Sequence, residues 1–275
     1  MILVVGDVME DLIVRPLGSF APRTDTPAHM ERQPGGSGAN TAAWLGALGA
    51  PVRFAGRVGQ ADVRRYAAEL AAFGVDARLS GDAEAPTGRI VVLAHDRSMF
   101  TDRGANVRLG ADGLGDDLLE GVAHVHVSGY ALVDAGPRAA VLDLVAHARL
   151  PWSIDPASAS YLSAAPPRAF LEWTAGAAVC FPNEDEAQTL GDGLADAYPV
   201  VVLKGSDRVR VLRDGALSAE VLAAPAVLVD PTGAGDAFAA GYLAAMLRGE
   251  DDAGCAAGGV GAAAQAVGRT GARPG

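Results

Sequence analysis

The sequence predicts a single α/β domain over residues 1–275, with a mostly parallel sheet covered by helices on both faces. Strand-like and helix-like patterns alternate through most of the chain, which is typical of a parallel sheet with helical crossovers. Half of the 275 residues are apolar, so the chain can bury one large core. Neighbouring strand patterns at 89–101 and 200–212 interrupt the alternation, and there we expect antiparallel pairs.

In chain order, the apolar run 2–5 before Gly6 and Asp7 predicts a buried first strand. Residues 12–34 contain four prolines and no helical period, which indicates a loop or short edge strands. A glycine-rich turn then opens a helix over 39–48 that ends at Gly49. Similar patterns predict the remaining elements of this half: strands 52–55, 75–79, 89–93 and 98–101, a helix over 61–73, and a His95-Asp96-Arg97 turn.

The second half of the chain continues the alternation. Apolar or alternating runs predict strands at 124–128, 152–155, 177–181, 200–203, 209–212 and 227–229. Helical periodicity predicts helices over 137–150, 234–247 and 253–267, and another that begins at 184–190. Ligands of such folds bind beyond the carboxyl ends of the strands, so we expect the chemistry at the junctions between strands and helices.

The charge balance restricts the partners of the protein. Asp and Glu outnumber Lys and Arg by 33 to 22, giving a formal net charge of −11, which disfavours nucleic acid and anionic lipid. The N-terminal residues lack the basic start of a signal peptide, and no apolar run reaches the roughly 18 residues of a membrane span. We therefore expect a cytoplasmic protein in which Cys180 and Cys255, far apart in apolar settings, are idle thiols.

The strongest candidate site is the segment from Val229 to Phe238. Its pattern predicts a buried strand that ends at Asp230, followed by small residues that lead into a helix. Small residues leave backbone N–H groups open to a ligand and the helix N-terminus adds partial positive charge, so the segment can hold a transferring phosphoryl group. Asp236 can then accept a proton from an attacking hydroxyl. A packing turn in which Asp236 is only a helix N-terminal charge explains the same residues equally well.

Two motifs together resemble the signatures of the ribokinase-like (PfkB) carbohydrate kinase family. They are Gly35-Gly36-Ser37-Gly38-Ala39-Asn40 and Asp230-Pro231-Thr232-Gly233-Ala234-Gly235-Asp236, which begin 195 residues apart. The resemblance implies a three-layer sandwich with a small β lid, formed by segments at about 12–34 and 88–102. It also implies ATP-dependent phosphorylation of a hydroxymethyl group on a sugar or nucleoside, Mg²⁺ as cofactor, and a homodimer that forms through the lid.

The resemblance further implies individual roles for residues in these motifs. Asp236 matches the catalytic base, and we expect the helix N-terminus to lower its pKa. The anion hole would consist of Gly233, Ala234 and Gly235. The residues that match substrate contacts are Asp11, Gly36, Ser37 and Asn40. Asp11 could bind two adjacent hydroxyls with its two oxygens, although a solvated loop acid is the alternative.

A second group of residues matches positions near the nucleotide. Asn183 and Glu186 resemble a motif for Mg²⁺ and phosphate, although an Asn helix cap explains the same residues. Lys204 and Gly205 lie where the family often has a nucleotide-phosphate loop. Many relatives have Thr where this chain has Leu203, which puts a hydroxyl contact there in doubt. Lys204 either reaches a phosphate or is a solvated turn residue.

The remaining assignments depend on the resemblance alone. Arg103 and Asn106 match a position near the sugar, with a surface turn as the alternative. Asp230 and Thr232, together with 269–272, resemble a site for a monovalent cation such as K⁺, and Thr232 also matches a nucleotide contact. Pro231 departs from the Thr of many relatives.

The sequence also allows interpretations other than a kinase. A sugar or nucleoside sensor with the same pocket and no useful turnover is the main alternative, and the intact Asp236 motif argues against it. An NAD-linked enzyme is disfavoured because no Gly-x-Gly-x-x-Gly follows the first strand. His124 and His126 share one face of a strand without a third ligand, so we expect core or edge residues rather than a zinc site.

Overall fold

The computed structural model describes residues 1–21, 23–93, 98–164 and 167–275. Its body is built on a nine-stranded sheet in the order β13-β12-β11-β10-β9-β8-β1-β4-β5. The strands from β11 to β5 in this order run parallel, and β12 and β13 add an antiparallel edge. The strands are β1 Ile2–Val5, β4 Val52–Gly59, β5 Asp76–Asp82, β8 His124–Ser128, β9 Trp152–Asp155, β10 Val179–Cys180, β11 Val200–Lys204, β12 Arg208–Arg213 and β13 Ala216–Leu222.

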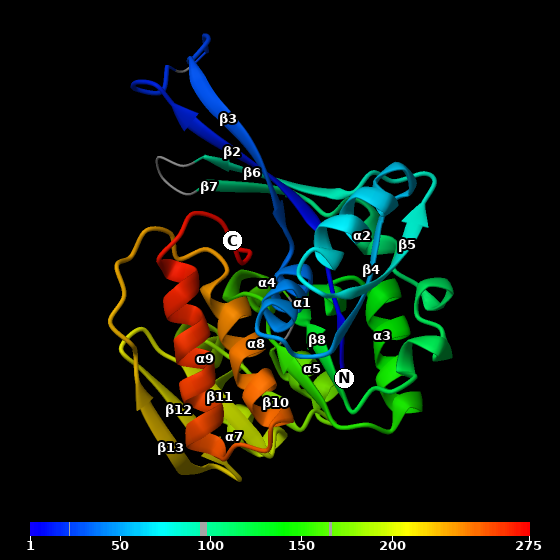
Figure 1. Ribbon diagram of the computed structural model, residues 1–275, viewed down its shortest axis with the longest axis vertical. Coiled ribbons are helices and arrows are strands. Elements are labelled where there is room, and N and C mark those ends of the chain that lie inside the picture. The colour runs from blue at the N-terminus through cyan, green and yellow to red at the C-terminus, as the bar shows by residue number, and fades with distance from the viewer. Residues whose placement is uncertain (22, 94–97, 165–166) are drawn as a thin grey trace.

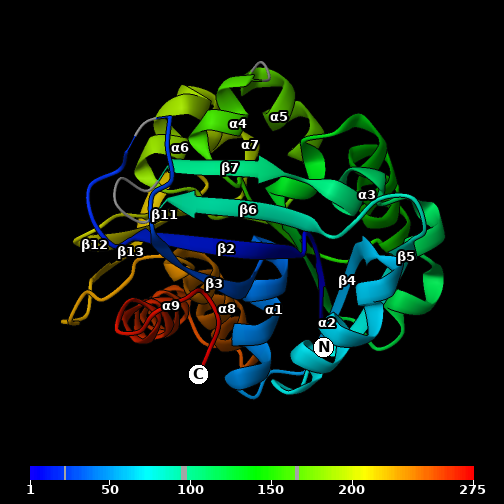
Figure 2. The same ribbon diagram turned by 90° about the horizontal axis from the view of Figure 1, so that it is seen from above.

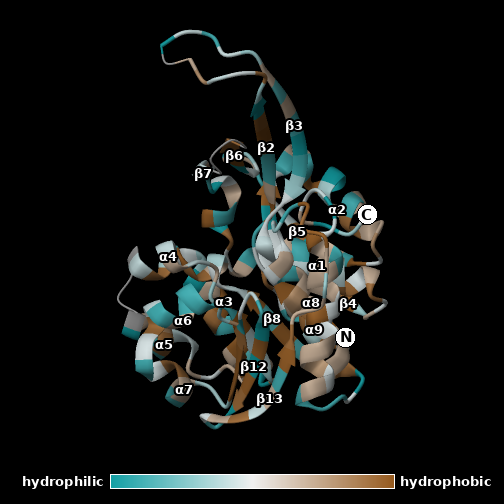
Figure 3. Ribbon diagram, turned by 90° about the vertical axis from the view of Figure 1, so that its left-hand side faces the viewer, coloured by the Kyte–Doolittle hydropathy of each residue, from teal (hydrophilic) through white to brown (hydrophobic). Residues whose placement is uncertain are grey.

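Helices cover both faces of this sheet, so the body has three layers (Figures 1 and 3). One face carries α1 Ser37–Ala47, α2 Val63–Ala71, α8 Ala234–Leu247 and α9 Asp252–Val267. The other carries α3 Ala135–Ala148, α4 Ala159–Ala164, α5 Pro167–Thr174, α6 Glu184–Leu190 and α7 Leu194–Ala197. Ile2 and Val4 pack in the first core, whereas Leu3 and Val5 pack in the second. A strand buried on both faces is therefore apolar throughout, as 2–5 is.

A second sheet lies across the top of the body, as Figure 2 shows. Its order is β3-β2-β6-β7, and its strands are β2 Met9–Pro16, β3 Ala28–Gly35, β6 Gly88–Leu93 and β7 Ser98–Asp102. We call this sheet the lid. Both segments predicted for a lid contribute strands to it, and the first is a long antiparallel hairpin rather than a loop. The turn expected at 95–97 lies outside the described residues.

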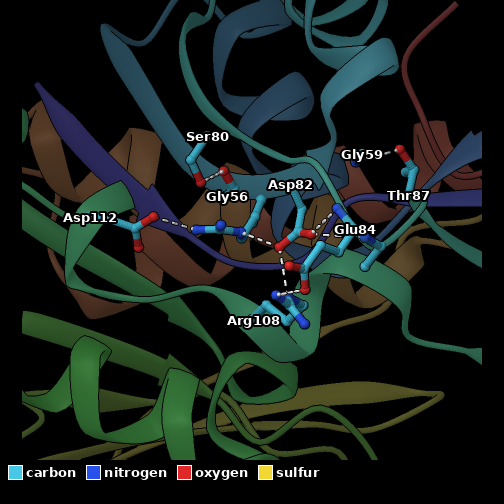
Figure 4. Close-up of polar contacts among 10 residues, drawn as sticks. Gly56, Gly59, Ser80, Asp82, Glu84, Thr87, Arg108 and Asp112 are labelled. Carbon is cyan, nitrogen blue, oxygen red and sulfur yellow. Dashed lines mark hydrogen bonds and ion pairs between the residues drawn. The ribbon is translucent and has the colours of Figure 1, made fainter.

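An ion-pair cluster around the buried carboxylate of Asp82 lies at the base of the lid (Figure 4). Asp82 is 2% exposed and accepts hydrogen bonds from the Nε atoms of Arg57 and Arg108, at 2.9 and 2.8 Å. Arg108 also donates to Glu84 at 2.6 Å. The backbone N–H of Ala85, the N–H of Glu84 and these arginines lower the pKa of Asp82. Because residues 82–87 precede β6 and Arg108 follows β7, the cluster joins the two ends of this lid hairpin.

Several predicted elements need correction. Residues 227–229 form no strand: Val227, Leu228 and Val229 are 80, 67 and 55% exposed, so an apolar run here marks surface rather than core. The edge strand β13 was missed, because it faces solvent on one side and its pattern is mixed. The short helices α4, α5 and α7 were also missed. The remaining predicted strands and helices are present with shifts at their ends, and no helix of the described chain could cross a membrane.

The predicted interior positions are confirmed. Cys180 and Cys255 are buried and free. His124 and His126 are buried, and both ring systems share the hydroxyl of Ser153 at 2.9 Å. Burial lowers the pKa of each histidine to about 3, so both are neutral core residues.

Candidate active site

A cavity of about 1070 Å³ lies between the lid and the carboxyl ends of the parallel strands. It lies beside β1, where the strand order changes direction. The next strands in sequence, β4 and β5, lie on one side of β1, and the later strands β8 to β13 lie on the other. Such a change of direction leaves a crevice at the strand ends, where ligands bind in open α/β sheets. Segments distant in sequence meet here: 7–15, 33–40, 90–103, 155–161, 183–186, 204 and 229–236 all contribute lining residues.

The N-terminus of α8 opens onto this cavity. Gly233 is its N-cap with φ of +77°, and no side chain caps the helix among the described residues. A Cβ on Gly233 would lie 2.7 Å from the Cα of Ala272, so both the backbone angle and the close approach require glycine. Gly233 and Gly235 line the cavity, whereas Ala234 does not. The N–H of Ala234 donates to the carbonyl of Pro231 at 3.2 Å, and the positive end of the helix borders the cavity through Gly233 and Gly235.

Asp236 lies in the first turn of α8 and is held from two sides. Its Oδ1 accepts a hydrogen bond from the hydroxyl of Ser37 at 2.7 Å, and its Oδ2 accepts one from Nδ2 of Asn40 at 3.0 Å. Burial raises the pKa of Asp236 to about 7, against the opposing effect of these two hydrogen bonds. The expected lowering by the helix N-terminus is therefore wrong, because desolvation of the carboxylate outweighs it.

The N-terminus of α1 lies opposite and is closed. The carboxylate of Asp7 accepts the backbone N–H groups of Ser37 and Gly38, at 3.2 and 3.1 Å, and the hydroxyl of Ser128. Gly36 has φ of +94° and packs on the backbone of Asp7, where a Cβ would lie 2.5 Å from its carbonyl oxygen. Gly36, Ser37 and Asn40, for which substrate contacts were expected, line the cavity, and the side chains of Ser37 and Asn40 bond to Asp236.

Asp11 projects from the lid strand β2 into the cavity. Its Oδ1 is buried without a hydrogen-bond partner in the structure. Burial and the nearby charge of Asp7 raise the pKa of Asp11 to about 6, while Arg273 opposes this rise. An acceptor atom left unpaired inside a cavity is suited to a ligand that brings its own hydroxyl.

Lys204 is at the end of β11, and its ammonium group binds Asp155 at the end of β9, 2.6 Å away. Both residues line the cavity and both side chains are largely buried, so Lys204 is not a solvated turn residue. Burial opposes its charge, but the carboxylates of Asp155, Glu186 and Asp236 raise its pKa. The neighbouring Gly205 does not line the cavity.

Asn183 and Glu186 line the same end of the cavity and form a capping box at the start of α6. Asn183 accepts the backbone N–H of Glu186 at 2.9 Å, and both carboxylate oxygens of Glu186 accept from Asn183 at 2.8 Å. Burial and repulsion from Asp155 raise the pKa of Glu186. Asn183 and Glu186 thus cap α6 and line the cavity at the same time. The helix cap therefore does not exclude a role in binding Mg²⁺ or phosphate.

Asp230 and Thr232 form a tight turn before α8. The carboxylate of Asp230 accepts the N–H and hydroxyl of Thr232, at 2.9 and 2.6 Å, and the N–H of Gly271 at 3.2 Å. Both residues line the cavity. The side chain of Asp230 therefore joins the turn to the 269–272 segment.

The two residues predicted near the sugar differ in position. Arg103 lines the cavity, with its guanidinium bound to Asp134 at 3.0 Å and to the carbonyl of Tyr130. Asn106 is buried and does not line the cavity; its amide bonds to the backbone N–H and C=O of Val8. Asn106 fastens the segment after β7 to the start of β2, which corrects its assignment to substrate.

The charged residues Asp7, Arg15 and Asp155 line the cavity and had no predicted role, and neither had the buried Arg273. Asp7 and Asp155 lie at the carboxyl ends of predicted strands, and that position was the signal that could have found them. Arg273 lies in an irregular segment, where no sequence pattern points to a site. Within the described residues, no group of three or more His, Cys, Asp or Glu side chains could hold a metal ion unaided.

Comparisons with known proteins agree with this geometry. The family model described as pfkB family carbohydrate kinase matches residues 1–275. The bifunctional protein HldE of Pseudomonas aeruginosa is 31% identical over 91% of this chain, which spans 56% of that protein. The chain thus covers about half the length of this relative.

Two further comparisons cover nearly all of their partners. The ATP-dependent ribose-1-phosphate kinase of Halopiger xanaduensis is 29% identical over 91% of this chain and 86% of its own. The crystal structure of adenosine kinase from Sinorhizobium meliloti superposes with a TM-score of 0.83 at 25% identity, covering 99% of this chain and 95% of that one. The chain belongs to the pfkB family of carbohydrate kinases.

Proposed function

We propose that the protein transfers the γ-phosphoryl group of ATP to a hydroxymethyl group of a sugar or nucleoside, with Asp236 as the base. The observation that carries this proposal is the position of Asp236 in the first turn of a helix whose open N-terminus faces the cavity. A carboxylate and an anion-binding helix end at one point can hold the two reacting groups together. The curated relative named as an ATP-dependent ribose-1-phosphate kinase supports ATP as donor.

Asp236 has to accept the proton of the attacking hydroxyl. Its two oxygens are held by Ser37 and Asn40, which fix the direction of the remaining lone pairs. Phosphoryl transfer has a loose transition state, so placing the hydroxyl and neutralising charge matter more than the strength of the base. Gly233 and Gly235 expose the backbone against which the transferred group is stabilised.

The lid supplies the acceptor side of the cavity in two rows. Gln33, Asp11, Ile90 and Thr101 are paired across the sheet, and one step farther out Ile13, Val92 and Met99 are paired. All seven line the cavity. The first row offers hydrogen bonds to hydroxyl groups, and the second is apolar. An acceptor with a hydroxyl-rich end and a less polar extension, as in a nucleoside, matches this order.

The charge of the cavity favours a neutral acceptor. Six carboxylates line it against three basic side chains: Asp7, Asp11, Asp155, Glu186, Asp230 and Asp236 against Arg15, Arg103 and Lys204. Each basic group already has an acidic partner, namely Glu31, Asp134 and Asp155 respectively. We therefore expect an uncharged sugar or nucleoside to be preferred over a phosphorylated one.

The nucleotide end of the cavity suits Mg²⁺. Asp155, Asn183 and Glu186 present oxygen donors there, and Mg²⁺ takes oxygen ligands, keeps several waters and binds phosphates directly. These residues would hold the ion through water, and the ion would neutralise phosphate charge. Lys204 is positioned beside the same end, and Thr232 borders it. A monovalent cation such as K⁺ at the 230–232 and 269–272 turns is part of the proposal, tested by activity in KCl against choline chloride.

The outer face of the lid supports the proposed homodimer. Leu12, Val14 and Val91 alternate with the cavity-lining residues, and Met30 and Phe100 on this face are 66 and 64% exposed. A second copy would cover this apolar surface, and light scattering after gel filtration tests it. We place the enzyme in the cytoplasm, where ATP is supplied.

The first test is ADP release with Mg-ATP across pentoses, hexoses, sugar acids, nucleosides and ribose 1-phosphate, with Asp236→Asn as control. We expect turnover on a neutral acceptor that falls by about 10²–10⁴ in the variant while substrate binding persists. Wild-type turnover in Asp236→Asn would remove Asp236 from the role. Thermal stabilisation by a sugar or nucleoside without ADP release would instead support the sensor.

A further inference from the structure

Arg273 is a buried charge directly beneath the site. It is 7% exposed, and it follows Ala272, which lines the cavity and whose carbonyl accepts the indole N–H of Trp44 at 2.9 Å. Arg273 itself does not line the cavity. A buried guanidinium is costly unless its donors are used, so its contacts indicate what it is there to hold.

The contacts of Arg273 converge on the α1 turn. Its Nε donates to Oδ1 of Asn40 at 3.3 Å, and its Nη2 donates to the carbonyl of Gly35 at 3.2 Å. Its Nη1 lies 3.6 Å from a carboxylate oxygen of Glu69 in α2. Burial lowers the pKa of Arg273, and the nearby carboxylates oppose this effect. The guanidinium thus joins α2, the α1 turn and the C-terminal segment.

The bond to Asn40 determines which way its amide faces. A guanidinium can only donate, so the atom of Asn40 turned toward it must be the carbonyl oxygen. The amide nitrogen then faces Oδ2 of Asp236, 3.0 Å away. A flipped amide would set its NH₂ against the guanidinium and its oxygen against the carboxylate, which is unfavourable on both sides.

We propose that Arg273 is a positioning residue for phosphoryl transfer, because it fixes the amide of Asn40 so that this amide orients Asp236. The inference rests on the proposed role of Asp236 as base.

The test is a double-mutant cycle between Arg273→Met and Asn40→Ala, with kcat, both KM values and the pH dependence of kcat/KM as readouts. We expect Arg273→Met to lower kcat by about tenfold to a hundredfold, because the base is misplaced rather than removed. The KM for ATP should change by less than about twofold, since no nucleotide contact is involved. The acid limb of kcat/KM should move to higher pH, since the hydrogen bond from Asn40 favours the charged form of Asp236.

The cycle separates positioning from general damage. If Arg273 acts through Asn40, then Arg273→Met in the Asn40→Ala background should leave the acid limb where Asn40→Ala puts it. Additive shifts, or an unchanged acid limb in Arg273→Met, would overturn the inference. If Arg273→Met does not fold, Arg273→Lys is tested instead. This variant keeps the positive charge but loses the planar set of guanidinium donors, so the acid limb of kcat/KM should still move to higher pH. An unmoved limb in folded Arg273→Lys would overturn it equally.

The Asp236→Asn control distinguishes the two levels of the argument. Full turnover in that variant would overturn the assignment of the base and this inference with it. An inactive Asp236→Asn together with an unshifted Arg273 variant would remove only the positioning role and leave the base in place.

Discussion

The helices α1 and α8 both begin at a glycine-rich turn on the rim of one cavity, but their first backbone N–H groups meet different partners. At α1, Asp7 occupies the helix end and accepts the N–H groups of Ser37 and Gly38. At α8, no side chain of the described chain caps the end, and Gly233 and Gly235 face the cavity. One helix end is closed by a side chain of the protein, and the other borders the cavity without a side-chain cap among the described residues.

This difference separates two uses of glycine-rich turns. A carboxylate held at α1 makes that end unavailable to phosphate, so α1 contributes side chains instead, through Ser37 and Asn40. The end of α8, which has no side-chain cap among the described residues, presents backbone to the cavity. A glycine-rich motif alone therefore does not identify an anion site; the partner of its N–H groups decides.

The largest effect that would sharpen this comparison is expected at Gly235→Ala. Among the described residues, apart from its chain neighbours and the backbone of its own helix, the only heavy atom within 4 Å of the added Cβ is Nζ of Lys204 at 3.5 Å, so the methyl group causes no clash. Alanine is better than glycine in a helix by about 1 kcal/mol, so the melting temperature should not fall. Turnover should fall about a hundredfold, because the transferred group is displaced from the helix end.

Gly261→Ala in α9 is the matched control, since its Cβ would meet nothing within 4 Å and it lies outside the cavity. Equal activity of the two variants would mean that the α8 end does not bind the transferred group.

A smaller effect, on stability, is expected at Asp7→Ala. The variant leaves the buried N–H groups of Ser37 and Gly38 without their acceptor, so the free energy of unfolding should fall by about 1–2 kcal/mol. Asp251→Ala is the comparison, because Asp251 caps α9 in solvent by accepting the N–H of Gly254 at 2.8 Å. Water can replace that exposed cap, so urea unfolding should show the smaller loss there. A larger loss at Asp251 would contradict the closed state of α1.

The smallest effect is the pH dependence of stability at α8. Burial raises the pKa of Asp236 to about 7, so the folded protein binds this proton more tightly than the unfolded chain. The charged carboxylate therefore costs stability increasingly from about pH 4 to about pH 7, and Asp236→Asn removes that cost. We expect the melting temperature of the variant, relative to wild type, to be several degrees higher at pH 8 than at pH 4.5.

Scanning calorimetry of Asp236→Asn and of the exposed surface change Asp192→Asn measures this difference. A gain that is the same at both pH values would show that Asp236 is not desolvated.

The sequence was sufficient for the order of the elements but not for their exposure. The apolar residues of β1 and α8 predict these elements correctly because both elements are buried in the core. The run 227–229 has the same composition and lies in solvent, since exposure depends on what packs over a segment. Strand β13 was missed for the complementary reason, because an edge strand needs only one apolar face.

The candidate site divides in the same way. Gly36, Gly233 and Asp236 were found because they lie in local motifs that resemble the family signatures. The contacts of Asp236 with Ser37 and Asn40 were not predicted, because they join residues almost 200 positions apart in the sequence. Nor could the sign of the pKa change of Asp236 be derived locally, since it depends on how much water the surrounding elements exclude.

The cluster around Asp82 sets the way in which the lid can deform. Arg108 follows β7 and binds both the buried carboxylate of Asp82 and the exposed carboxylate of Glu84 ahead of β6, so rotation at the base of this hairpin would separate both ion pairs. The hairpin should thus be held most firmly where its two strands leave the body. In hydrogen–deuterium exchange, the amides near Gly88 and Asp102 should be protected longest, and labelling should accelerate along β6 and β7 with distance from them.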